Sequence, residues 1–250
     1  MSLSAQQREQ YSRHLSLPQI GEAGQEKLFA ARVVLIGAGG LGSPAAFYLA
    51  AAGVGTLGIV DHDRLELSNL QRQILHTAAD LGREKTASAA DRLRAINTDV
   101  RVETYAMRLT PGNAAGLLGP WDFVIDATDN FESKFLIADA CHAVKRPYSH
   151  GGITRFFGQA LTVLPGASAC YRCVFSAAPA WNEADSQPAG PLGAVPGVIG
   201  AIQATEALKY LLNMGDLLTN RLLTYDALKM KFRVVPVRQN PACSLCGARG

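Results

Sequence analysis

A glycine-rich segment, Gly37-Ala38-Gly39-Gly40-Leu41-Gly42, follows an aliphatic run near the start of this 250-residue chain. Its spacing fits the GxGxxG pattern at Gly37, Gly39 and Gly42. In that pattern the first glycine permits a tight turn, the second lets the backbone approach a phosphate, and the third allows close helix–strand packing. Asp61 follows about 20 residues later, where a carboxylate can bind a ribose hydroxyl. These residues predict a nucleotide site.

Two basic residues beyond Asp61 narrow the expected ligand. Arg72 and Lys85 can reach phosphates attached to a ribose held by Asp61. A triphosphate needs such positive charge, whereas a nicotinamide half does not. The glycine pattern alone would favour a dinucleotide oxidoreductase, and the polar run 61–73 could be only a solvated loop. The two cations favour a nucleoside triphosphate.

A further polar group, Asp126-Ala127-Thr128-Asp129-Asn130, follows an apolar run that is expected to be a buried strand. Open α/β sheets bind ligands at the carboxyl ends of their strands. Asp129 could therefore hold Mg²⁺ together with phosphate oxygens. The alternative is that Asp126 or Thr128 caps the helix expected from Phe131.

Four of the five cysteines form two CxxC pairs, Cys170/Cys173 and Cys243/Cys246. Four thiolates are enough for a tetrahedral structural zinc, which would clamp the C-terminal tail to a distant loop. A redox role is the alternative, but neither pair is expected to start a helix after a thioredoxin-like strand. Cys141 lies among Ala and Val in an expected helix, so we interpret it as a core residue.

The elements that must position these residues alternate between strands and helices in the first half of the chain. A capping-box spacing of Ser4 and Gln7 predicts a short first helix that carries residues 11–14. Further helices are expected at 25–31, 43–52, 83–96, 111–118, 131–144 and 198–212. Strands are expected at 32–36, 56–60, 100–105, 123–126, from 148, and at 158–164, 222–226 and 232–236. This order predicts an α/β fold. Its Rossmann-like doubly wound sheet should be mostly parallel in the N-terminal half and continue into antiparallel strands in the C-terminal half, beside the zinc site.

Composition excludes several classes of protein. Apolar residues make up 48% and charged residues 18% of the chain, a balance typical of a soluble enzyme. A net charge of +3 does not suggest nucleic-acid binding. No apolar stretch of roughly 20 residues and no signal peptide is seen, so we expect a cytoplasmic protein without a membrane partner. Segment 176–196 is rich in Ala, Pro and Gly, and it should form a loop over the active site.

Taken in order, these motifs resemble the MoeB/ThiF family of bacterial activating enzymes, relatives of the ubiquitin-activating enzymes. The resemblance covers nearly the whole chain. It rests on the motifs above and on segments 11–15, 24–28, 60–73, 203–209, 225–227, 232–233 and 240–247. The ending resembles the molybdopterin-pathway member more than the thiamine-pathway one.

The resemblance implies that ATP binds on the glycine loop, that Asp61 holds the ribose, and that Asp129 holds Mg²⁺. The implied phosphate ligands are Asn69, Arg72 and Lys85, and the implied glycine contacts are Gly37, Gly39, Gly40 and Gly42. Arg13 would reach into the site of the other subunit of a homodimer. Arg13, Arg72, Lys85 and Asp129 would form the catalytic set.

The implied partner is a small ubiquitin-like sulfur-carrier protein with a C-terminal Gly-Gly. Its carboxylate would attack the α-phosphate of ATP and release pyrophosphate. The carboxylate is already ionised at neutral pH, so the step needs positioning and charge stabilisation instead of a general base. The implied organisation is a single domain over 1–250. It comprises an N-terminal helical arm (1–31), a nucleotide-binding half (32–150) and a carrier-binding and zinc half (151–250) that contains the crossover loop 176–196.

One position departs from the family pattern. Many relatives carry a cysteine in the crossover loop, and the aligned residue here is Ser186. A serine hydroxyl forms no thioester, so we expect the enzyme to stop at the acyl-adenylate and to depend on an external sulfur donor. We also expect no appended rhodanese-like sulfur-transfer domain, because the chain ends within a few residues of Cys246. A carrier of the thiamine or another pathway, a nicotinamide-dependent oxidoreductase and an inactive scaffold remain the alternative interpretations.

Overall fold

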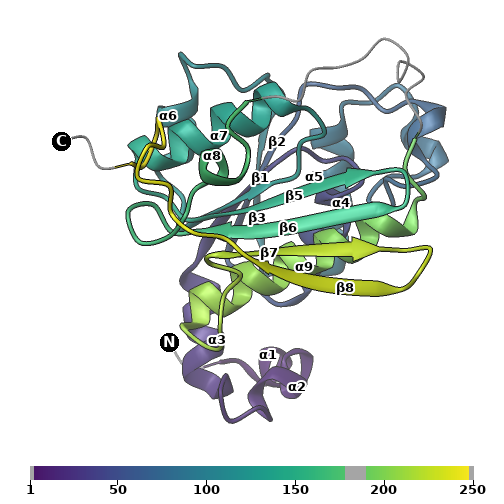
Figure 1. The fold of residues 1–250 in the computed structure, drawn as a ribbon. Coiled ribbons are helices and arrows are strands. Elements are labelled where there is room, and N and C mark those ends of the chain that lie inside the picture. Colours follow the sequence, from purple (N-terminus) through teal and green to yellow (C-terminus); the bar gives the residue numbers. More distant parts are fainter. Residues whose placement is uncertain (1–2, 178–189, 248–250) are drawn as a thin grey trace.

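The computed structural model describes residues 3–177 and 190–247, and an eight-stranded mixed sheet runs through its centre (Figure 1). The strand order is β3-β2-β1-β4-β5-β6-β7-β8. The five strands from β3 to β5 are parallel, and β6, β7 and β8 continue the sheet antiparallel. The strands are β1 (Arg32–Ile36), β2 (Thr56–Val60), β3 (Arg101–Tyr105), β4 (Phe123–Asp126), β5 (Tyr148–Thr154), β6 (Phe157–Val163), β7 (Arg221–Asp226) and β8 (Lys231–Pro236). The predicted fold class is confirmed.

Helices cover both faces of the parallel part of the sheet. The α-helices are α1 (Ala5–Gln10), α2 (Ser12–Leu15), α3 (Gly21–Ala30), α4 (Gly42–Ala51), α5 (Lys85–Ile96), α6 (Ala114–Leu118), α7 (Phe131–Ala143), α8 (Tyr171–Val174) and α9 (Ala194–Leu212). Two 3-10 turns, η1 (Leu67–Asn69) and η2 (Ala78–Asp80), follow β2. No helix among the described residues is long and apolar enough to cross a lipid bilayer.

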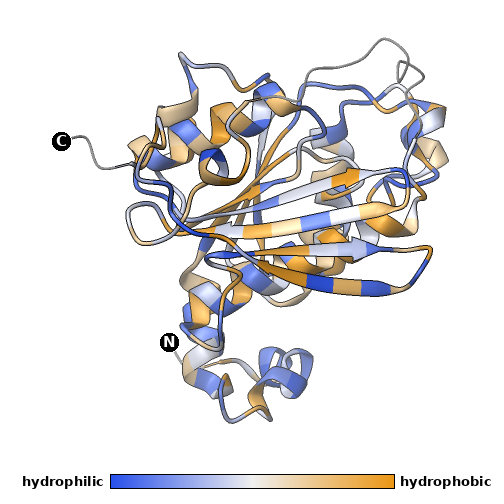
Figure 2. Ribbon diagram, viewed as in Figure 1, coloured by the Kyte–Doolittle hydropathy of each residue, from blue (hydrophilic) through white to orange (hydrophobic). Residues whose placement is uncertain are grey.

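Alternate residues of the central strands enter two separate cores. Val33 and Leu35 pack with residues of α3, α4, α5 and α9, whereas Val34 and Ile36 pack with residues of α6 and α7. A strand that is buried on both faces must be apolar throughout, and this explains the continuous aliphatic run in the sequence. Figure 2 shows the apolar residues concentrated in the central strands, while α1 and α2 are largely hydrophilic.

Helices α3 and α9 each begin about one turn earlier than expected, and they include residues that usually end helices. Helix α3 begins at Gly21, earlier than expected, and its Gly24 lies against Ile20 and Leu212, where a β-carbon would come within 2.9 Å of Ile20. Helix α9 begins at Ala194 and includes Pro196 in its first turn. Proline is tolerated there because the first N–H groups of a helix have no partner within it.

The N-terminal arm confirms the capping box but divides the expected helix. Ser4 Oγ accepts a hydrogen bond from the Gln7 N–H at 3.1 Å, and Gln7 Oε1 accepts one from the Ser4 N–H at 3.0 Å. Helix α1 then ends at Gln10. Tyr11 is buried and its hydroxyl accepts a hydrogen bond from Asn97 at 2.7 Å, so the chain turns at this anchored side chain and α2 follows.

The expected loop at 176–196 is shorter on its C-terminal side, since Ala194, Val195 and Pro196 belong to α9. Residues 178–189, with Ser186 among them, lie outside the described residues.

Candidate active site

A cavity of about 330 Å³ opens at the carboxyl ends of β1, β2 and β4. Its walls include many of the predicted nucleotide ligands, which come from the glycine loop, the segment after β2 and the turn after β4. These predicted residues are Gly37, Gly39, Gly40, Asp61, Arg72, Lys85 and Asp129. The site therefore forms where the topology of a doubly wound sheet places a ligand.

The glycine loop leaves no room for side chains at two of its positions. Gly37 has a φ of +105°, and a β-carbon there would lie 2.7 Å from the Ala127 carbonyl oxygen. A β-carbon on Gly42, the first residue of α4, would lie 2.0 Å from the Gly37 carbonyl oxygen. At Gly39 the nearest atom would be 3.6 Å away. Gly37 and Gly42 thus shape the turn, while Gly39 faces the cavity.

Asp61 and His76 hold the glycine loop through contacts with the backbone of Ala38. The Ala38 N–H donates to Asp61 Oδ2 at 2.8 Å, and the Asp63 N–H donates to Asp61 Oδ1 at 2.9 Å. The Ala38 carbonyl lies 2.9 Å from His76 Nε2, and His76 Nδ1 lies 2.8 Å from Ser88 Oγ. Burial lowers the pKa of His76, so a neutral ring can donate from Nε2 to the loop. We did not predict His76, whose role depends on contacts across the fold.

The two predicted cations already have partners on the cavity wall. Lys85 is buried, and its ammonium donates to Asp63 Oδ2 at 2.8 Å. Burial acts to raise the pKa of Asp63, but the hydrogen bond and charge of Lys85 outweigh it and lower that pKa. Arg72 Nη1 donates to the Ser68 carbonyl at 3.1 Å. Both cationic groups lie beside the same cavity, close to the glycine loop.

Two aspartates at the turn after β4 differ in their exposure to solvent. Asp129 is exposed and lines the cavity, and its carboxylate accepts a long contact of 3.5 Å from the Asn130 amide. Asn130 caps α7, because its Oδ1 accepts the Ser133 N–H at 2.8 Å. The expectation that Asp126 or Thr128 caps this helix is therefore wrong. Asp126 is buried and accepts from both the N–H and the hydroxyl of Thr128.

Behind this turn, Asp126 forms a buried charged group with Lys134 and His150. Lys134 Nζ lies 3.3 Å from Asp126 Oδ1, and His150 Nδ1 lies 2.9 Å from Asp126 Oδ2. Burial acts to raise the pKa of Asp126, but the Lys134 charge and the hydrogen bonds of His150 and Thr128 lower it to about 2. Burial and the charge of Lys134 lower the pKa of His150, so its neutral ring donates from Nδ1. We predicted neither Lys134 nor His150.

Three predicted ligands lie away from the cavity wall. Asn69 sits in η1, where its Oδ1 accepts the Glu66 N–H at 3.2 Å. Gly42 packs against the Gly37 carbonyl oxygen and is not part of the cavity wall. Arg13 is exposed on α2, which lies with α1 at the N-terminal end of the molecule, at the bottom of Figure 1. The functions assigned to these residues from the sequence stay predictions.

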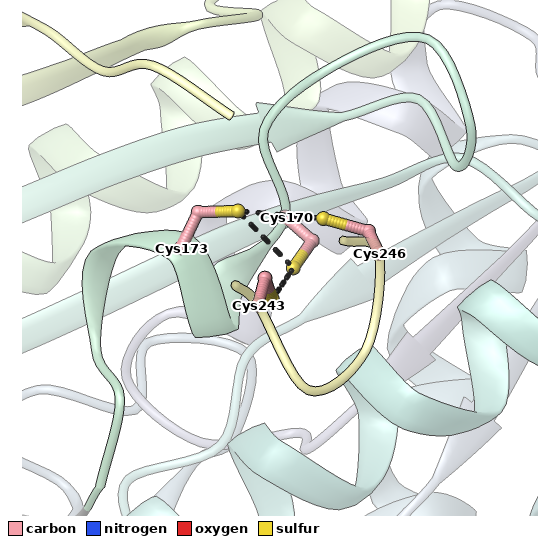
Figure 3. Close-up of side chains that lie close together, drawn as sticks. All are labelled: Cys170, Cys173, Cys243 and Cys246. Carbon is pink, nitrogen blue, oxygen red and sulfur yellow. Dashed lines mark hydrogen bonds between the residues drawn. The ribbon is translucent and has the colours of Figure 1, made fainter. Parts of the chain in front are cut away.

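The four paired cysteines converge at a second site (Figure 3). Their sulfur atoms all lie within 4.8 Å of one another, with Cys170–Cys243 at 3.5 Å and Cys173–Cys246 at 3.3 Å. A tetrahedral zinc with Zn–S bonds of about 2.3 Å separates its sulfurs by about 3.8 Å, so this cluster could hold a metal such as zinc. Cys170 immediately precedes the four-residue helix α8, and the preceding strand β6 ends earlier, at Val163. The convergence of four thiols, with no disulfide, nevertheless favours metal binding over a two-thiol redox pair.

Comparison with known proteins identifies the family of this chain. The model of the ThiF family matches residues 11–245, which include the glycine loop, both aspartate motifs and three of the four paired cysteines. The chain belongs to the ThiF family. The resemblance to the MoeB/ThiF activating enzymes is thereby confirmed.

Relatives match along the full chain. The SAMP-activating enzyme E1 of Haloferax volcanii is 47% identical over 251 residues, covering 100% of this chain and 93% of that protein. The sulfur carrier protein adenylyltransferase of Thermus thermophilus is 45% identical over 253 residues, covering 99% of this chain and 93% of that protein. The probable adenylyltransferase/sulfurtransferase MoeZ of Mycobacterium tuberculosis is 43% identical, and the match covers 96% of this chain but 63% of that longer protein.

Solved structures share the fold. The crystal structure of E. coli MccB superposes with a TM-score of 0.86 at 23% identity, covering 99% of this chain and 74% of that one. PaaA superposes with a TM-score of 0.80 at 24% identity, covering 95% of this chain and 76% of that one. Family membership and fold therefore agree with the mixed sheet described above.

Proposed function

We propose that this chain is an adenylyltransferase that uses ATP to activate the C-terminal carboxylate of a small ubiquitin-like sulfur-carrier protein. The observation that carries the proposal is the joint placement of the glycine loop, Arg72, Lys85 and Asp129 on one cavity at the carboxyl ends of β1, β2 and β4. The relatives named as a sulfur carrier protein adenylyltransferase and as an E1 enzyme support the same activity.

The cavity has suitable groups for the phosphates and the ribose of ATP. The backbone at Gly37, Gly39 and Gly40 can approach the phosphates, and Asp61 can accept from the ribose hydroxyls. Arg72 and Lys85 would stabilise negative charge on the phosphate oxygens, and Asn69 would add a polar contact. A nicotinamide-dependent oxidoreductase would have less use for these cations.

The proposed reaction forms one bond and breaks one. An oxygen of the carrier carboxylate attacks the α-phosphorus, the bond from that phosphorus to the bridging oxygen of the β-phosphate breaks, and pyrophosphate leaves. The nucleophile is already ionised, so the protein needs to orient it and to stabilise charge. Asp129 suits Mg²⁺, because its carboxylate is exposed in the cavity and only weakly engaged. When bound there, Mg²⁺ would neutralise phosphate charge.

The remaining assignments rest on the sequence. The carrier, with its Gly-Gly tail, would bind the half of the chain over 151–250 and pass its tail beneath the crossover loop. The enzyme would act as a cytoplasmic homodimer in which Arg13 completes the site of the other subunit. Zinc on the four cysteines would hold the C-terminal end in place. With Ser186 in the crossover loop, an external donor would supply sulfur to the adenylate, and the ending of the chain favours a molybdopterin-type carrier over a thiamine-type one.

Carrier-dependent ATP–pyrophosphate exchange tests the proposal. Arg72→Ala and Asp129→Ala should each lower exchange by about 100-fold or more, because each removes a group that stabilises phosphate charge. The fold should survive, since Asp129 is exposed and Arg72 is only partly buried. Arg64→Ala is the matched control: Arg64 lies in the same polar stretch but is bonded to the Gly82 carbonyl and is not part of the cavity wall. Near-normal exchange in either cavity variant would refute the assigned roles.

A further inference from the structure

Lys134 lies directly beneath the turn that presents Asp129 to the cavity. Its side chain is 8% exposed, and its ammonium lies within hydrogen-bond distance of two carbonyl oxygens, the Asp126 carboxylate and the Thr128 hydroxyl. Nζ lies 2.6 Å from the Gly151 carbonyl oxygen, 2.7 Å from the Thr128 carbonyl oxygen, and 3.3 and 3.4 Å from the two Asp126 carboxylate oxygens. The three N–H donors of this lysine therefore join the end of β4, the following turn and β5.

The contact distances of the Lys134 ammonium distinguish two possible roles of this group. Balancing the buried Asp126 charge requires only the ion pair, whose contacts are the longer ones. The shorter bonds go to the carbonyl oxygens of Thr128 and Gly151, which carry no net charge and need no counter-ion. The Thr128 carbonyl belongs to the peptide bond that leads into Asp129. Restraining this carbonyl restrains the direction in which the next side chain leaves the backbone.

We propose that Lys134 is a positioning residue, whose ammonium holds the Thr128 carbonyl and thereby aims Asp129 into the nucleotide cavity. This inference rests on the proposed function, in which Asp129 serves the phosphates of ATP. Asp129 itself is exposed and only weakly bonded, so its orientation depends on the backbone on either side. Lys134 restrains that backbone before Asp129, and the Asn130 cap on α7 restrains it afterwards.

Other contacts hold the end of β4 when the lysine is removed. The Asp126 carbonyl accepts from Gln203 Nε2 at 2.8 Å, and the Asp126 side chain is bonded to His150 and to Thr128. Loss of the ammonium should therefore loosen the turn at Thr128 and Asp129 without displacing the strand. This separation allows the positioning role to be tested apart from stability.

The decisive comparison uses the double variant Lys134→Met/Asp126→Asn. Methionine keeps most of the length of the side chain, and asparagine removes the charge that would otherwise be left buried without a counter-ion. We expect the double variant to melt close to the wild type. We also expect it to need about 10- to 100-fold more Mg²⁺ for half-maximal ATP binding in calorimetry, the range typical of lost support behind a metal ligand. The kcat of exchange should fall with it, while the KM for the carrier changes little.

Lys209→Met is the matched control. Lys209 also pairs with a buried carboxylate, that of Glu206, and donates to the Asp216 carbonyl at 2.6 Å, but neither partner is part of the cavity wall. Its removal should lower the melting temperature and leave the Mg²⁺ requirement unchanged. If the double variant does not fold, the single variant Lys134→Met, measured below its own melting temperature, gives the same comparison.

The outcomes distinguish this inference from the proposed function. An active wild type that is matched by the double variant in Mg²⁺ requirement and kcat would overturn the positioning role, because Lys134 would then only balance Asp126. A wild type that binds no ATP and exchanges no pyrophosphate would contradict the proposed function and the inference with it. A Mg²⁺ requirement raised above that of the single variant Asp126→Asn, at a melting temperature close to the wild type, supports the inference.

Discussion

Asp126, Lys134 and His150 lie together in the interior, behind the cavity that we propose binds ATP, and their side chains contact one another. The ammonium and the imidazole donate to the carboxylate, which keeps its charge despite full burial. The motif at 126–130 is visible in the sequence, but its partners are not. Lys134 reaches it from the first turn of α7, and His150 reaches it because the parallel register places it directly opposite Asp126. Register between strands cannot be read from spacing along the chain.

The charge of Asp126 should make stability depend on acidity. Its pKa is about 2 in the folded protein, below the ordinary value of the unfolded chain, so its contribution is present above the unfolded pKa and is lost as the pH falls through the folded one. Asp126→Asn should therefore be less stable than the wild type at pH 7, and the gap in unfolding free energy should narrow as the pH falls below about 4. Urea unfolding of the wild type and of Asp126→Asn, repeated between pH 7 and pH 3, measures this difference in unfolding free energy. A gap that stays constant with pH would contradict the assignment.

At the scale of elements, α9 packs closely against the start of α4, next to the glycine loop. Gly200 of α9 lies so close to the start of α4 that a β-carbon there would be 2.2 Å from the Leu41 carbonyl oxygen. Helix type was predictable from the apolar sequence, but the start of α9 was not, because Pro196 and Gly197 near its start are residues that usually disfavour a helix. The start of α3 was missed for a similar reason, since its Gly24 packs on Leu212 of α9.

Two glycines on α9 should respond oppositely to alanine. Gly200→Ala forces Leu41 and α4 to move, and such overpacking costs about 1–3 kcal/mol. Gly197→Ala meets no atom within 4 Å of the new β-carbon, so it should stabilise the protein by about 0.5–1 kcal/mol through helix propensity. Denaturant unfolding of the two variants makes the comparison. Equal effects of the two substitutions would show that α9 is not held against α4 in this way.

At the scale of the whole molecule, residue types and order were enough to predict the parallel half, the antiparallel continuation and the convergence of two distant CxxC pairs. Topology explains this success: a doubly wound sheet gathers the ends of its strands at one edge, wherever the intervening helices begin. The same reasoning could not find His76, Lys134 or His150, whose side chains act through contacts that only the folded chain provides. The four cysteines bring the C-terminal segment into contact with α8, about 70 residues earlier in the chain.

Activation of the carrier's C-terminal carboxylate by ATP can be measured directly. The chain is incubated with ATP, Mg²⁺ and a ubiquitin-like carrier ending in Gly-Gly, hydroxylamine is added to trap the acyl-adenylate, and the intact mass of the carrier is determined. We expect a carrier hydroxamate that forms only with ATP and is lost in the Asp129→Ala variant. An unmodified carrier, across molybdopterin-type and thiamine-type candidates and with ATP shown to bind, would contradict it.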